Sequence, residues 1–260
     1  MRILFIGDVV GGSGRRGLAA AMPALRERHS PDLVIVNGEN SAGGLGITER
    51  TAGEIFDAGA DVITTGNHVY RHRDVYGYLD STDRVIRPAN YPHGNPGRGH
   101  TILEAGGRTV AVINLSGAVG LRVARSPFHE ADSLLERIGD RAEVALVDFH
   151  AEVTSEKVAM GWHLDGRVAA VLGTHTHVPT ADARVLPGGT AHISDVGMTG
   201  SRAGVIGVRA EQALESLITQ MPVRFETAEE DVWVMGVVIG VRPDGLAESI
   251  EQVLVPANIR

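Results

Sequence analysis

The sequence predicts an α/β fold, a four-layer α/β/β/α sandwich of two packed mixed sheets. Apolar runs alternate with helical patterns through the first half of the 260 residues, which is typical of parallel strands joined by right-handed crossovers. Toward the end of the chain, strands cluster and pair locally, so each sheet should be mixed. No linker, repeat or low-complexity segment interrupts this pattern, and we expect a single domain over residues 1–260.

The elements of the first half follow from their apolar periodicity. Strands are expected where apolar residues run on between turn signals, and helices where they recur every three to four residues. Thr48 is suited to cap the second helix, and Pro23 should kink the first helix or delay its start. The expected strands are 2–7, 32–38 and 61–68, and the expected helices are 15–29, 48–59 and 73–80.

The second half carries more strands than helices. A Gly-Gly turn joins two strands within 100–117, and a Pro-Asp-Gly turn at 243–245 joins the last two within 231–255. Between these hairpins, strands and helices alternate again. They are helix 127–139, strand 143–150, helix 154–166, strand 167–175, strand 190–197 and helix 210–221.

Composition excludes several classes of function. The net charge is −8, with 24 basic and 32 acidic side chains, so no basic stripe is expected to bind a nucleic-acid backbone. The chain has no cysteine, which excludes disulfides, thiolate zinc sites and a cysteine nucleophile. The start of the sequence lacks a secretory signal pattern, and no apolar run is long enough to span a membrane. We therefore expect a soluble, cytoplasmic protein with no membrane partner.

Polar side chains directly follow five of the expected strands. The carboxyl ends of parallel strands share one edge of a sheet, where such sheets bind ligands. His175 and His177 stand two apart in an expected extended segment, so both rings should face the same volume. Each residue alone has an ordinary interpretation as a turn, cap or loop residue, but their joint placement favours a shared site. The set is Asp8, Glu39, Asn40, Asn67, His68, His150, His175 and His177.

These side chains are suited to bind metal ions. Oxygen and nitrogen donors without sulfur match Mn²⁺, Fe²⁺ and Zn²⁺, and match Mg²⁺ less well because of the imidazoles. The set exceeds the needs of one ion and suits two ions about 3.5–4 Å apart, bridged by a carboxylate and a water-derived hydroxide. Such a pair neutralises a phosphate and stabilises an in-line transition state. The residues alone therefore point to phosphoester chemistry.

Five sequence blocks carry a resemblance to a known superfamily. They read GDVVG, NGENSAGG, GNHVY, DFH and GTHTH, in this order between residues 7 and 177. In order and placement they resemble the calcineurin-like metallophosphoesterase superfamily. The residues of these blocks, together with DVGMTG at 195–200, are most similar to the YmdB-like branch of bacterial 2′,3′-cyclic-nucleotide phosphodiesterases. The resemblance implies a metallophosphoesterase fold that opens 2′,3′-cyclic nucleotides to 3′-nucleotides.

The resemblance also implies a role for each residue of the set. Attack would come from a metal-bridging hydroxide, with His68 as the general acid that protonates the leaving ribose oxygen. One ion would take Asp8, Glu39, Asn40 and His177, and the other would take Glu39, Asn67, His150 and His175.

The blocks depart from the superfamily pattern at several positions. Val10 stands where a histidine is usual, and Glu39 replaces the bridging aspartate. Val69 follows His68 where an acid is usual, so no adjacent carboxylate fixes the tautomer of that histidine. An amide in place of a histidine makes the site harder, which favours Fe or Mn over Zn, while the imidazoles favour them over Mg.

Other interpretations stay open beside this one. GSGRRG at 12–17 fits a dinucleotide-binding loop, although a flexible turn into the first helix accounts for it better. A metal-binding regulatory or scaffold protein with incidental phosphatase activity is the alternative function. Thr199 and Arg202 are candidate substrate contacts. RNA ends that carry a cyclic phosphate are further candidate substrates, and a homo-oligomer is possible by analogy.

Overall fold

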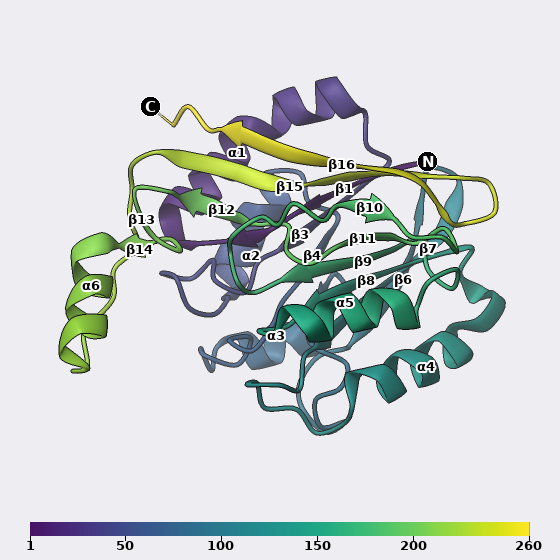
Figure 1. Ribbon diagram of the computed structural model, residues 1–260, viewed down its shortest axis with the longest axis horizontal. Helices are drawn as coiled ribbons and strands as arrows, with labels where there is room; N and C mark the ends of the chain where they lie inside the picture. The colour runs from purple at the N-terminus through teal and green to yellow at the C-terminus, as the bar shows by residue number, and fades with distance from the viewer. Residues whose placement is uncertain (260) are drawn as a thin grey trace.

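Two facing mixed sheets form the centre of the protein in the computed structural model, which describes residues 1–259 (Figure 1). The first sheet has the strand order β2-β12-β15-β1-β3-β4-β5, with β16 on the other side of β15, and the second has the order β10-β11-β9-β8-β7-β6. The strands of the first sheet are β1 (Arg2–Ile6), β2 (Asp8–Val9), β3 (Leu33–Asn37), β4 (Val62–Thr64), β5 (Val85–Ile86), β12 (Met198–Ser201), β15 (Val232–Val241) and β16 (Ala247–Pro256). Those of the second are β6 (His100–Ala105), β7 (Arg108–Ser116), β8 (Val144–His150), β9 (Ala170–Thr174), β10 (Arg184–Val185) and β11 (Ala191–Ile193).

Helices cover the outer face of each sheet, which confirms the predicted four layers (Figure 1). An apolar core between the sheets joins Phe5 and Ile35 to Val112 and Leu146. A second core lies under α1, α2 and α3, and a third lies under α4 and α5. The helices are α1 (Gly11–His29), α2 (Glu49–Asp57), α3 (Val75–Ser81), α4 (Pro127–Ile138), α5 (Thr154–His163) and α6 (Ala210–Thr219), with a 3₁₀ turn at Gly139–Arg141.

Parallel pairing aligns the strand ends that carry the candidate residues. In the first sheet β1, β3, β4 and β5 run parallel, and in the second β7, β8, β9 and β11 do so. The hairpins β6–β7 and β15–β16 are antiparallel, as predicted. The carboxyl ends of β3, β4, β8 and β9 therefore lie at one edge of the sandwich.

The first helix differs from the sequence prediction. It begins at Gly11 and runs through Pro23, so GSGRRG is helical and neither the dinucleotide loop nor the flexible turn exists. A Cβ on Gly14 would lie 2.3 Å from the carbonyl oxygen of Thr199, so the glycine lets the helix approach β12 closely. Pro23 and Ala19 are both exposed, so water reaches the carbonyl that Pro23 leaves without a helical partner.

The segment after β11 also differs. The predicted strand 190–197 ends at Ile193, and the chain turns before the separate strand β12. The strands β13 (Gly204–Val205) and β14 (Val208–Arg209) form a small hairpin, from which α6 projects away from the sandwich (Figure 1).

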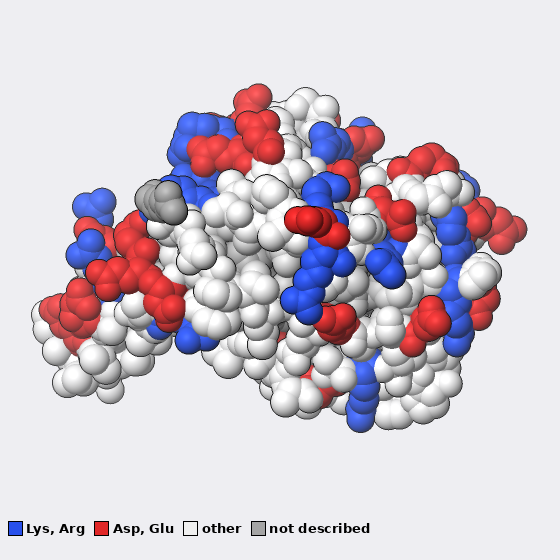
Figure 2. Space-filling model, turned by 90° about the horizontal axis from the view of Figure 1, so that it is seen from above, with Lys and Arg blue, Asp and Glu red and all other residues white. Residues whose placement is uncertain are grey.

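Figure 2 shows Lys and Arg side chains interspersed with Asp and Glu on the face drawn, without a continuous basic band. Within residues 1–259, no helix has the length and apolar character that crossing a bilayer requires.

Candidate metal centre

The eight candidate side chains meet where the two sheets face each other. Asp8 begins β2, Glu39 and Asn40 follow β3, and Asn67 and His68 follow β4. His150 ends β8, while His175 and His177 follow β9 in the opposite sheet. Each sheet thus contributes one side of the cluster.

His150 lies at the centre of one group of donors. Its Nε2 is 3.1 Å from Glu39 Oε1, 3.0 Å from Asn67 Oδ1 and 3.0 Å from His175 Nδ1. One oxygen or nitrogen atom from each of Glu39, His150 and His175 lies within 4.8 Å of the others, which is the spacing of a chelating set.

A second group of donors surrounds His177. Its Nε2 is 3.7 Å from Asp8 Oδ1 and 3.2 Å from Asn40 Nδ2. The same Asn40 nitrogen is 3.2 Å from Glu39 Oε1, so Glu39 lies between the two groups. The Asn40 oxygen faces His68, and the amide must turn before that oxygen can face His177.

Hydrogen bonds orient His150 toward the cluster. Its Nδ1 is 2.8 Å from the hydroxyl of Thr174, and that hydroxyl donates to Asp148 at 2.7 Å. The hydroxyl therefore accepts the Nδ1 proton of His150, which leaves Nε2 facing Glu39. Buried metal-binding histidines are commonly held in this way.

The other two histidines follow the same rule. His175 Nε2 is 2.8 Å from Glu152 Oε2, so its Nδ1 is left for the cluster. His177 Nδ1 is 2.9 Å from the carbonyl oxygen of Ile206, so its Nε2 faces Asp8. All three imidazoles thus have one nitrogen bound to an outer acceptor and the other directed inward.

The backbone at these two histidines is not extended. His175 has φ 97° and His177 has φ 66°, in the region that side chains other than glycine rarely adopt. The buried Asp195 carboxylate holds the turn by accepting from the N–H and hydroxyl of Thr176 and from Lys157, at 2.7–3.0 Å. The rings share one volume because of this turn, and not because of strand alternation as expected.

Burial and mutual charge set the ionisation of the cluster. Burial raises the pKa of Asp8. Burial alone would raise the pKa of Glu39, but His150 and His68 beside it hold that pKa well below its ordinary value. Burial opposes the charge on His150, yet Glu39 overcomes it and raises the pKa of His150 to about 9. Burial and the charge of His150 lower the pKa of His175 to about 4.

Three observations indicate that the cluster is suited to bind divalent cations. Asp8 Oδ1 is buried and has no hydrogen-bond partner within residues 1–259, which is costly unless a ligand completes it. A Cβ on Gly66 would lie within 2.4 Å of His150 and Glu39, so the chain leaves no side chain between them. The donors are carboxylate oxygens, amide oxygens and imidazole nitrogens, which borderline divalent metals prefer.

His68 stands at the edge of the cluster. Its Nδ1 is 2.9 Å from Asn40 Oδ1 and 3.2 Å from Glu39 Oε1, and its side chain is 32% exposed. No acid is adjacent to His68 in the chain, as expected, but Glu39, which follows β3, contacts Nδ1 where Val69 cannot. Its Nε2 remains available to a bound molecule.

A cavity of about 450 Å³ opens beside the cluster. Glu39, Asn40, His68, His175 and His177 form its polar wall. The rest of its lining is largely apolar and comes from the segments after β2 and β3, the β13–β14 hairpin, and α6 with the loop after it. It includes Val10, Leu45, Val205, Ile206, Leu217 and Phe225.

A family model described as YmdB-like protein matches residues 4–253. The chain belongs to the YmdB-like family. A Bacillus subtilis (strain 168) protein named 2′,3′-cyclic-nucleotide 2′-phosphodiesterase is 46% identical over 256 residues, covering 98% of this chain and 97% of that protein. Both findings confirm the resemblance seen in the sequence blocks.

Two solved structures share the YmdB-like fold over nearly the whole chain. A hypothetical protein from Thermus thermophilus is 41% identical, with a TM-score of 0.93, and the match covers 99% of this chain and 100% of that one. A phosphatase from Mycoplasma pneumoniae is 31% identical, with a TM-score of 0.92, and the match covers 98% and 93%.

Thr199 and Arg202 do not reach the cavity of this YmdB-like chain. Thr199 is fully buried in β12, where it pairs with Val9 of β2. Arg202 lies 3.4 Å from Asp231 and stacks over Trp233. The prediction that they contact substrate is therefore not supported by this cavity, because residues 198–201 form the buried strand β12 and neither side chain lines the cavity.

The sequence interpretation missed the residues that orient the histidines. Asp148 lies two positions before His150 in a strand, so both side chains face the same side, and this spacing was the available signal. Glu152 lies two positions after His150 but beyond the strand end. The carbonyl of Ile206 carries no signal, since any residue provides one.

Proposed function

We propose that this chain is a dinuclear-metal phosphodiesterase that hydrolyses 2′,3′-cyclic nucleotides. The orientation of the three imidazoles around two buried carboxylates carries the proposal. The printed name of the Bacillus subtilis relative supports the substrate class. The two groups of donors that share Glu39 support two cations rather than one.

Asp8, Glu39, Asn40 and His177 would hold one cation, and Glu39, Asn67, His150 and His175 the other. Bound there, the cations would supply a water-derived nucleophile at neutral pH and neutralise charge on the phosphate. The amide ligands favour Fe or Mn over Zn, and the imidazole ligands favour them over Mg. Metal analysis of protein purified without chelator or added metal tests this preference, and zinc alone at stoichiometric amounts would contradict it.

His68 is the residue that we propose as the proton donor to the leaving group. Hydrolysis forms a P–O bond from water and breaks the P–O2′ bond, and the departing O2′ takes up a proton. His68 would donate that proton from Nε2, because Glu39 and Asn40 engage Nδ1. The apolar part of the cavity lining would hold the base and limit water around it.

Product analysis tests the proposal directly. With 2′,3′-cyclic AMP, we expect adenosine 3′-monophosphate as the product, and we expect Asp8→Asn to abolish turnover while circular dichroism shows a retained fold. Turnover that survives Asp8→Asn, or a 2′-monophosphate product, would contradict the proposal.

A further inference from the structure

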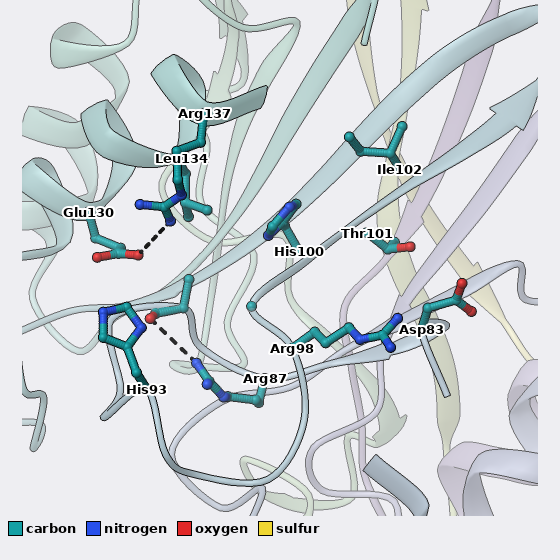
Figure 3. Close-up of a pocket in the computed structure, with 12 residues that line it drawn as sticks. Asp83, Arg87, His93, Arg98, His100, Thr101, Ile102, Glu130, Leu134 and Arg137 are labelled. Atoms are coloured by element: carbon teal, nitrogen blue, oxygen red, sulfur yellow. Dashed lines mark hydrogen bonds and ion pairs between the residues drawn. The ribbon is translucent and has the colours of Figure 1, made fainter. Parts of the chain in front are cut away.

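A second cavity of about 450 Å³ lies away from the metal cluster's own cavity and shares no lining residue with it. It is bounded by the loop after β5, the start of β6 and one face of α4 (Figure 3). It is therefore a separate site, which the proposed hydrolysis does not use.

The lining of this second cavity is rich in cationic and imidazole groups. Arg87, Arg98 and Arg137 line it together with His93 and His100 (Figure 3). This concentration contrasts with the net charge of −8 for the whole chain.

The two acids in the lining do not balance these arginines. Glu130 is shared, since it lies 2.7 Å from Arg125 Nε and 3.4 Å from Arg137 Nη2. Within residues 1–259, Asp83 lies within ion-pair distance of no arginine, and neither Arg87 nor Arg98 has a carboxylate partner. A local positive excess remains.

Arg87 is the residue that most needs a ligand. It is only 5% exposed, and one of its terminal nitrogens donates to the backbone oxygens of Pro88 and Ala89, at 2.8 and 3.4 Å. Its Nε is buried and has no hydrogen-bond partner in the described chain. A buried cation without a counter-ion is costly, and an anion in the cavity would remove that cost.

We propose that this cavity binds the phosphoryl group of a small phosphorylated molecule. Several guanidinium groups around one cavity match a tetrahedral dianion, because each presents a planar fork of donors to its oxygens. Apolar side chains of Ala89, Ile102 and Leu134 line the rest of the cavity. A volume in the range of ligand pockets leaves room for an organic group beside the phosphate.

Calorimetry on the metal-loaded protein tests this site with inorganic phosphate as the probe. We expect two phosphates to bind per wild-type chain, one at the metal centre and one in this cavity. Arg98→Gln should weaken only the second by at least tenfold, and Asp8→Asn should abolish only the first. Arg28→Gln, on the exposed side of α1, is the matched control and should change neither.

The opposite pattern would overturn the proposal. A single phosphate per chain that Asp8→Asn removes and Arg98→Gln leaves intact means that the cavity binds no phosphoryl group. Arg87→Gln should act like Arg98→Gln and more strongly. If burial of that side chain makes the variant unfold, Arg98→Gln and Arg137→Gln still decide the question.

Adenosine 3′-monophosphate and adenosine separate two sources of the phosphoryl group. Tighter binding of the nucleotide than of inorganic phosphate, lost in Arg98→Gln, identifies a nucleotide as the occupant. Equal affinities identify free phosphate. Binding of adenosine that equals that of its monophosphate would overturn the proposal, because the arginines would then contribute nothing.

Discussion

Substitution of His68 tests its proposed role as the acid that protonates the leaving group. His68→Ala should lower kcat for 2′,3′-cyclic AMP by roughly 10²–10⁴-fold, because an alkoxide leaves poorly without a proton. The metal content should stay that of wild type. The loss should be much smaller with bis-p-nitrophenyl phosphate, whose nitrophenolate leaves without help.

His129→Ala, at a position of α4 outside both cavities, is the control for this comparison and should match wild type with both substrates. Equal losses with the cyclic nucleotide and the nitrophenyl ester would argue against His68 as the acid. They would place its role in binding instead.

Thr174 is predicted to orient His150. Thr174→Val removes the hydroxyl that accepts from Nδ1, so His150 loses its fixed orientation, and metal affinity should fall by roughly 10–100-fold. Thr199→Val is the matched control, since Thr199 is also buried in a strand but its hydroxyl has no partner within residues 1–259. Unchanged metal affinity in Thr174→Val, measured by competition with a chelator, would refute this role.

Residue type and strand position were enough to find the inward-facing donors. A carboxylate or imidazole directly after an apolar strand is rarely buried without a partner or a ligand, and all eight predicted side chains lie together. The contacts of Thr199 and Arg202 were mispredicted for a physical reason. The glycine-flanked segment around them forms the buried strand β12, which Gly14 of α1 approaches closely.

Because α1 packs closely against β12, alanine should change the free energy of unfolding in opposite directions at two helical glycines. Gly14→Ala should destabilise the protein by about 1–3 kcal/mol, because its Cβ would meet a backbone oxygen that cannot move aside. Gly53→Ala in α2 should stabilise it by about 0.5–1 kcal/mol, because no atom lies within 4 Å of the new Cβ. Chemical denaturation measures both, and equal effects would contradict the packing argument.

The start of α1 could not be predicted from the local sequence. Three glycines among residues 12–17 disfavour a helix by propensity, so the expected start fell after them. Tertiary contact with the sheet reverses that preference. The capping of α2 by Thr48 was predictable, because a capping box depends only on neighbours in the chain.

Because the candidate ligands come from both sheets, bound cations would join the two halves of the sandwich. Removal of metal by chelation should therefore lower Tm, and readdition of Mn²⁺ should restore it. A cation present at about 100 times its dissociation constant contributes about 2.7 kcal/mol. Differential scanning calorimetry measures the change, and Asp8→Asn should show no response to chelator. A wild-type Tm that ignores chelation would contradict the arrangement.

The layered architecture was predictable because alternation of strand and helix has few packed solutions. The strands β5, β10, β13 and β14 were not predicted. Each has two residues, too few to show any periodicity, and exists only through its pairing partner. The β13–β14 hairpin beside the cavity was missed for the same reason, whereas the helix α6 that follows it was predicted at 210–221.

Position 66 must be glycine in any related sequence that keeps His150 and Glu39 in this arrangement. Every other amino acid would place a carbon atom where the imidazole of His150 and the carboxylate of Glu39 already lie. A mutation there would displace His150 and Glu39, which we propose as metal ligands, even though residue 66 offers no side chain to the site. In sequence surveys, this one position would distinguish intact copies from those that have lost the reaction.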